Sequence, residues 1–211
     1  MERITLDIEG AASVSALLQI PPRARACYVF AHGAGAGMTH PFMAAVADQL
    51  EQRGIATLRF QFPYMERGSK RPDSPRVAHG AVRAAVGEAS RRAPALPLVT
   101  GGKSFGGRMT SQAQAASPLP GVRGLVFLGF PLHPAGKPAT ERGEHLFDVK
   151  LPLLFVQGER DALAEPRLLR SLVEQLGPLA SLHIVPGGHS FAVADPVIDI
   201  MVGWIDGIIA A

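Results

Sequence analysis

The 211-residue chain is poor in several residue types, and each shortage excludes a class of protein or site. Cys27 is its single cysteine, so no disulfide can form within the chain; its apolar surroundings favour a buried strand. The seven histidines include no paired ligand spacing such as H-E-x-x-H, so we expect no metal. Charged residues make up 18% of the chain and hydrophobic residues 47%, a balance that excludes a disordered protein.

Long apolar runs and concentrated charge are also missing. No window approaches 18 uninterrupted apolar residues, and "MERITLDIEG" at the N-terminus lacks the basic and apolar regions of a signal peptide. We therefore expect a cytoplasmic protein without a membrane partner. The net charge is only +3, and the densest basic group, in residues 67–76, has no interleaved aromatic side chains. We therefore expect no nucleic-acid partner.

The chain does contain a regular alternation of short apolar runs and amphipathic stretches. The runs predict strands at residues 3–8, 15–20, 27–32, 55–60, 96–102, 124–130, 151–158 and 182–186. The amphipathic stretches predict helices at residues 41–54, 76–93, 106–116, 166–177 and from about 196 onward. This alternation is typical of a mostly parallel sheet with helices on both faces. We predict a single α/β domain over residues 1–211, with its site at the carboxyl ends of the strands.

The segment "PLVTGGKSFGGRMT", residues 97–110, fits two incompatible motifs. Read as far as Ser104, it ends in the GKS of a phosphate-binding P-loop. That motif needs a glycine five positions before Gly102, and the residue there is Pro97. The loop is therefore too short to wrap a phosphate, and the sequence disfavours nucleotide binding.

The second motif in this segment is G-x-S-x-G, centred on Ser104. In a nucleophile elbow, a strand turns sharply into a helix and holds the serine at the apex in a strained conformation. Small neighbours are then a steric requirement, and here they are Gly101, Gly102, Gly106 and Gly107. The helix that follows would add partial positive charge where an oxyanion forms. The segment therefore favours a nucleophilic serine.

The partners that such a serine requires follow in the order Ser, acid, His, each in a loop after a predicted strand. Asp161 follows "LPLLFVQG", with Glu159 as the alternative acid. His189 lies in the glycine-rich turn after "LHIVP". We predict that His189 takes the proton of Ser104 and that Asp161 orients the imidazole.

A glycine-rich turn after another predicted strand supplies the remaining part of such a site. In "CYVFAHGAGAG", His32 and Gly33 lead into Ala34, whose backbone N–H we expect to join that of Phe105 in an oxyanion hole. The glycines there are spaced G-x-G-x-G, without the third glycine of a dinucleotide-binding loop. We expect no cofactor.

Taken together, these motifs resemble the α/β-hydrolase superfamily, and in particular its small cap-less KANL/Tex-type branch of hydrolases. The similarity is carried by "AHGAGAGMTHPFM", "LRFQFPY", "GGKSFGGRM", "GFPLHPAGKP", "LLFVQGERD" and "GGHSF". It runs from about Tyr28 to Phe191 and implies the same nucleophile, acid, base and oxyanion loop. It implies no particular substrate. Some relatives serve as subunits of larger assemblies, so a silent scaffold stays open as the alternative.

Several further residues are candidates for the pocket wall. Lys103 precedes the nucleophile and has either a structural or a pocket-lining role, as has His133 after the strand at 124–130. His32 and Gly33 would order the oxyanion loop. The segment between Phe130 and Leu151 is too short and too rich in proline for a helical cap. We therefore predict an open serine hydrolase site, of the carboxylesterase or thioesterase kind, for a small acyl substrate.

Overall fold

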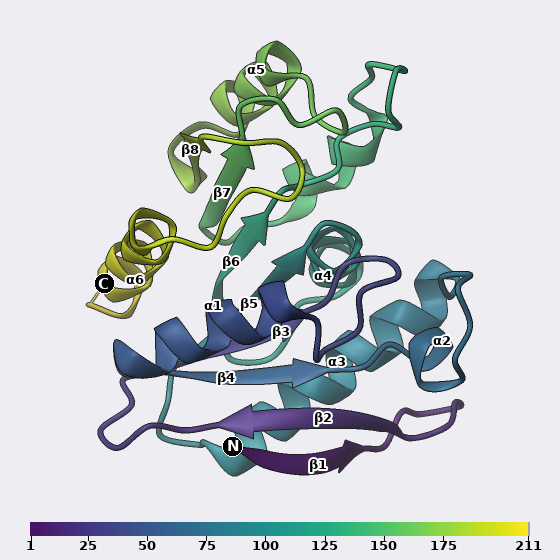
Figure 1. Ribbon diagram of the computed structural model, residues 1–211, viewed down its shortest axis with the longest axis vertical. Helices are drawn as coiled ribbons and strands as arrows, with labels where there is room; N and C mark the ends of the chain where they lie inside the picture. The colour runs from purple at the N-terminus through teal and green to yellow at the C-terminus, as the bar shows by residue number, and fades with distance from the viewer. Residues whose placement is uncertain (211) are drawn as a thin grey trace.

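The computed structural model, which describes residues 1–210, contains one eight-stranded sheet (Figure 1). Its strands, in chain order, are β1 (Glu2–Leu6), β2 (Val14–Gln19), β3 (Ala26–Ala31), β4 (Ile55–Phe60), β5 (Leu98–Lys103), β6 (Val122–Leu128), β7 (Leu153–Gly158) and β8 (Ala180–Val185). Their spatial order is β1-β2-β4-β3-β5-β6-β7-β8. β1 pairs antiparallel with β2, and β2 pairs antiparallel with β4; all other neighbours are parallel. The predicted mostly parallel sheet is confirmed.

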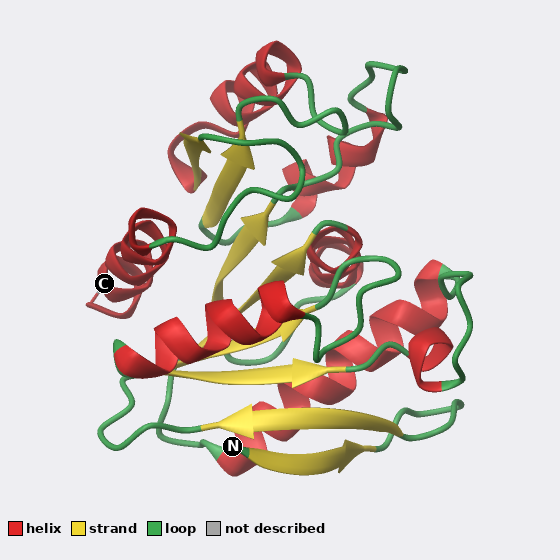
Figure 2. Ribbon diagram, in the orientation of Figure 1, coloured by secondary structure: helices red, strands yellow, loops and turns green. Residues whose placement is uncertain are grey.

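Helices cover both faces of this sheet, as Figure 2 shows. On one face α1 (Pro41–Gln52) and α6 (Asp195–Ala210) pack together over the strands. On the other lie α3 (Pro75–Arg92), α4 (Phe105–Ala116) and α5 (Pro166–Leu176), with a short 3₁₀ helix, η2 (Gly177–Leu179), after α5. Strands buried between two helical layers must be apolar on both sides, and every residue of β3 is buried.

The spacing of small residues decides how closely α3 lies against the sheet. Four buried alanines recur every three or four positions along it: Ala78, Ala81, Ala85 and Ala89. They form one face of the helix, and their short side chains let its backbone approach the strands. α3 contacts α4, the helix that follows the serine turn, so this packing also supports the site.

Two segments expected as loops contain short helices. α2 (Pro63–Glu66) begins with a proline, whose missing N–H costs nothing in a first turn, and it buries Tyr64. The 3₁₀ helix η1 (Glu141–Asp148) lies between β6 and β7 and buries Gly143 and Leu146 against the core. η1 packs on α4 and α5, and no residue of it lines the cavity beside Ser104. The fold therefore has no cap. Every helix in residues 1–210 is too short or too polar to span a membrane.

Candidate active site

Ser104 stands at the sharp turn between β5 and α4, in a backbone conformation that side chains rarely adopt. Its φ is 51° and its ψ −116°. Neighbouring backbone leaves no room for side chains around it: a Cβ on Gly102 or Gly106 would lie 2.5 Å from the carbonyl oxygen of Ala31. The glycines are therefore needed because β5 and α4 both press against β3. This packing holds the strained turn, which presents the Ser104 hydroxyl beyond the carboxyl end of β5.

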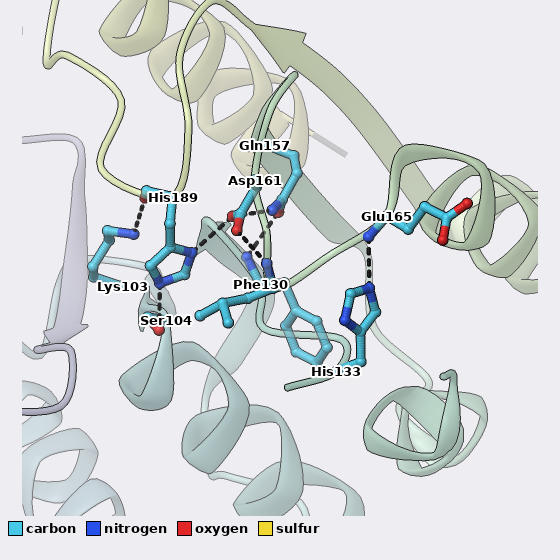
Figure 3. Close-up of polar contacts among 9 residues, drawn as sticks. Lys103, Ser104, Phe130, His133, Gln157, Asp161, Glu165 and His189 are labelled. Atoms are coloured by element: carbon cyan, nitrogen blue, oxygen red, sulfur yellow. Dashed lines mark hydrogen bonds and ion pairs between the residues drawn. The ribbon is translucent and has the colours of Figure 1, made fainter. Parts of the chain in front are cut away.

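The structure brings Ser104, His189 and Asp161 into one hydrogen-bonded chain (Figure 3). His189 Nδ1 lies 2.7 Å from Asp161 Oδ2, and His189 Nε2 lies 2.7 Å from Ser104 Oγ. A carboxylate can only accept, so Nδ1–H donates to Asp161. That leaves Nε2 to accept the proton of the Ser104 hydroxyl. The three residues come from turns after β5, β7 and β8.

Asp161 is held by two further donors that lie outside the sequence motifs. Its Oδ2 accepts a 2.5 Å hydrogen bond from Gln157 Nε2, and its Oδ1 accepts from the backbone N–H of Leu163 at 2.8 Å. The Gln157 side chain is itself held, because its Oε1 accepts from the backbone N–H of Phe130. The only sequence signal for Gln157 was a polar residue near the end of the apolar strand "LLFVQG".

The turn after β3 carries the predicted oxyanion loop. Among residues 1–210, neither the N–H of Ala34 nor that of Phe105 donates a hydrogen bond to another protein group. Both residues adjoin Ser104 or the cavity beside it, and Phe105 begins α4. Two unused N–H donors next to a nucleophile are what an oxyanion requires.

His32 stabilises the oxyanion loop from the protein interior. It is fully buried; its Nε2 accepts from the backbone N–H of Phe62, and its Nδ1–H donates to the carbonyl of Gly33. Burial lowers the pKa of His32 to about 4, so the ring is neutral at physiological pH. The Tyr64 hydroxyl accepts from the N–H of Gly35 at 3.1 Å, so α2 also braces the loop. Both contacts stabilise the backbone that carries Ala34.

A cavity of about 360 Å³ opens beside Ser104 and His189. Its wall combines the oxyanion loop, the start of α1 and the turns after β7 and β8; the lining residues are Gly33, Ala34, Ala36, His40, Phe42, Met43, Lys103, Ser104, Leu163, His189 and Ser190. Most of the lining surface is apolar. The site can therefore take a small substrate with an apolar portion.

Residues 24–196 match the family described as an alpha/beta hydrolase domain. This chain belongs to the α/β-hydrolase family. Solved structures agree in fold over almost the whole of each chain. A dienelactone hydrolase from Anabaena variabilis superimposes with a TM-score of 0.81 at 23% identity, covering 98% of this chain and 97% of that one.

Two further structures show the same α/β-hydrolase fold. Est1E from Butyrivibrio proteoclasticus, solved with ferulic acid bound, gives a TM-score of 0.80 at 18% identity, covering 99% of this chain and 100% of that one. A serine hydrolase without a lid from Xanthomonas campestris gives a TM-score of 0.72 at 20% identity, covering 99% of this chain and 93% of that one. At these identities the likeness concerns the fold.

Two candidates for the pocket wall do not line the cavity of this α/β-hydrolase, and the alternative acid is not part of the hydrogen-bonded chain. His133 does not line the cavity, because its Nε2 accepts from the backbone N–H of Glu165 and its Nδ1–H donates to the carbonyl of Pro134. His32 does not line it either, because it is buried behind the oxyanion loop, where its contacts agree with the loop-ordering role expected from the sequence. The alternative acid, Glu159, is exposed and pairs with Arg160. Gly33 and Lys103, by contrast, do line the cavity.

Proposed function

We propose that this α/β-hydrolase is a serine hydrolase that cleaves an ester, thioester or similar acyl bond of a small substrate. The observation that carries the proposal is the unbroken hydrogen-bonded chain from Ser104 Oγ through His189 to the buried Asp161, beside an open cavity. The activity in the name of the dienelactone hydrolase supports hydrolysis, although it specifies no substrate for this chain.

Each group in the site has a defined task in the reaction. Ser104 Oγ attacks the carbonyl carbon while its proton passes to His189 Nε2. The N–H groups of Ala34 and Phe105 hold the resulting oxyanion. The bond to the leaving group then breaks, and His189 gives that group its proton. Water attacks the acyl-serine, again losing its proton to His189, and the acid product leaves as Ser104 regains its proton.

The competing function is a scaffold that keeps the fold without activity. A scaffold has no physical need for a strained serine turn, a hydrogen-bonded histidine and two unused N–H donors at one cavity. Their joint presence favours the enzyme. The absence of a cap favours small or exposed acyl groups over bulk lipid.

Labelling by a fluorophosphonate probe tests this function. The wild type should become labelled, with the adduct mapped by mass spectrometry to Ser104, whereas Ser104→Ala and His189→Ala should not. Circular dichroism of all three proteins checks that they are folded. A folded but unlabelled wild type would contradict the proposal and leave the scaffold.

A further inference from the structure

Lys103 is a charged side chain in the cavity wall that the proposed reaction does not use. It is the last residue of β5, directly before the nucleophile, and only 8% of it is exposed. Its Nζ donates a 2.6 Å hydrogen bond to the backbone carbonyl of His189. The same Nζ lies 5.6 Å from the ring centroids of both Phe42 and Phe191, within the range of cation–π contact.

This ammonium group has no carboxylate of its own. No residue that lines the cavity is acidic, and within residues 1–210 no acidic side chain lies within ion-pair distance of Lys103. Asp161 is the acid whose charge reaches it, but that carboxylate already accepts from His189, Gln157 and Leu163. Figure 3 shows Lys103 and Asp161 on opposite sides of the His189 ring.

The Lys103 ammonium is also incompletely hydrogen-bonded. An ammonium has three N–H donors, and in residues 1–210 only the His189 carbonyl accepts from this one. Burial without a counter-ion disfavours the charged form, which lowers the pKa of Lys103 to about 8. Holding the His189 carbonyl would require only a neutral donor. A charge kept at this cost beside the nucleophile instead fits a ligand that supplies the missing anion.

We propose that Lys103 binds a carboxylate carried by the substrate, so that the natural acyl compounds are anionic. This inference rests on the proposed hydrolase function and specifies its substrate class. The carboxylate does not react; it pairs with the ammonium while the apolar part of the substrate lies against Phe42 and Met43, which line the same cavity. Lys103 would then determine specificity and, through the His189 carbonyl, also position the base.

Matched substrate pairs separate these two roles. For the acyl side, mono-4-nitrophenyl adipate is compared with the neutral 4-nitrophenyl ester of 6-methylheptanoic acid, of similar shape. For the leaving-group side, 4-acetoxybenzoate is compared with 4-methylphenyl acetate. The wild type should prefer the anionic member of at least one pair by about 10- to 100-fold in kcat/KM, the usual effect of a hydrogen bond to a charged group.

Two variants test whether the charge of Lys103 produces that preference. Lys103→Met removes charge and donor and packs its apolar chain against the two phenylalanine rings. Lys103→Gln removes the charge but keeps N–H donors for the His189 carbonyl. Both variants should lose the preference. A wild type that does not distinguish the members of either pair, or variants that slow both members equally, would overturn the proposal and leave a positioning role.

A binding measurement keeps the inference testable if no ester is turned over. Adipate should raise the Tm of Ser104→Ala more than adipamide at matched ionic strength, and the double variant with Lys103→Met should lose this difference. If the fluorophosphonate labels nothing, the hydrolase function fails, and the adipate shift alone then decides the role of Lys103. Equal shifts with adipate and adipamide would refute carboxylate binding even in an active enzyme.

Discussion

Gln157 donates a 2.5 Å hydrogen bond to the same oxygen of Asp161 that His189 reaches with Nδ1. The side chains of Gln157 and Asp161 are almost fully buried. Gln157 also accepts a hydrogen bond from the backbone N–H of Phe130. The glutamine therefore joins the end of β6 to the acid that orients His189. Gln157 is a positioning residue, since it acts on the reaction only through Asp161.

Replacing Gln157 by leucine should reduce both stability and activity. The backbone N–H of Phe130 would be left buried without a partner, at a cost of about 1–3 kcal/mol in the free energy of unfolding. Asp161 would be held less firmly, so we expect kcat to fall by roughly tenfold with little change in KM, a much smaller loss than removal of the acid itself should cause. Urea unfolding and steady-state ester kinetics measure the two effects. An unchanged kcat in a destabilised variant would restrict Gln157 to a role in folding.

Asp161→Asn should decrease kcat by about 10³- to 10⁴-fold, because the amide no longer favours the His189 tautomer that accepts from Ser104. Glu159→Gln is the matched control, since Glu159 is exposed and contacts Arg160. Its kcat should stay within about twofold of the wild type, the size of a surface effect. Steady-state hydrolysis of a 4-nitrophenyl ester gives kcat for each variant. The opposite ranking would identify Glu159 as the acid.

Gly106→Ala should prevent folding of the serine turn, because the new Cβ would lie 2.5 Å from the carbonyl oxygens of Ala31 and His32. Backbone atoms cannot move aside as a flexible side chain can, and we expect a loss of more than about 3 kcal/mol. Gly87→Ala, in α3, is the control: nothing lies within 4 Å of its new Cβ, and it should stabilise the helix by about 0.5–1 kcal/mol. Thermal melts of the two variants should therefore shift in opposite directions.

His32 should make stability depend on pH below neutrality. Its pKa is about 4 in the native protein because of burial, and about 6.5 when unfolded. Between these values the unfolded chain binds a proton that the native protein does not, so the free energy of unfolding falls as pH drops from about 6.5 to about 4. The loss attributable to His32 should approach about 3 kcal/mol, or 1.36 kcal/mol for each unit of the difference.

His32→Gln is the variant that isolates this effect, because glutamine can still accept from the N–H of Phe62 and does not titrate. Denaturant unfolding at several pH values gives the difference in stability between wild type and variant. That difference should shrink as pH falls through the window. His145, whose pKa is also lowered to about 4, is present in both proteins and cancels. A difference independent of pH would show that His32 titrates normally.

The sequence by itself determined the order of strands and helices and the identity of Ser104, Asp161 and His189 as candidates. Apolar runs, helical periodicity and glycine-rich turns are local patterns, and each candidate lies in the turn after its own strand. Because parallel strands end at one sheet edge, loops far apart in the chain must converge there. The short helices α2 and η1 escaped prediction because tertiary burial of Tyr64 and Leu146 stabilises them, and local propensity does not.

Only the tertiary structure decided what surrounds these three side chains. The contact of Lys103 with the His189 carbonyl joins residues 86 positions apart, and that of His32 with Phe62 joins residues 30 positions apart. His133 likewise accepts a hydrogen bond from the backbone N–H of Glu165, a donor that is distant in sequence and that packing leaves in need of an acceptor. No local pattern encodes such pairs, because they arise when packing places one unsatisfied polar group beside another.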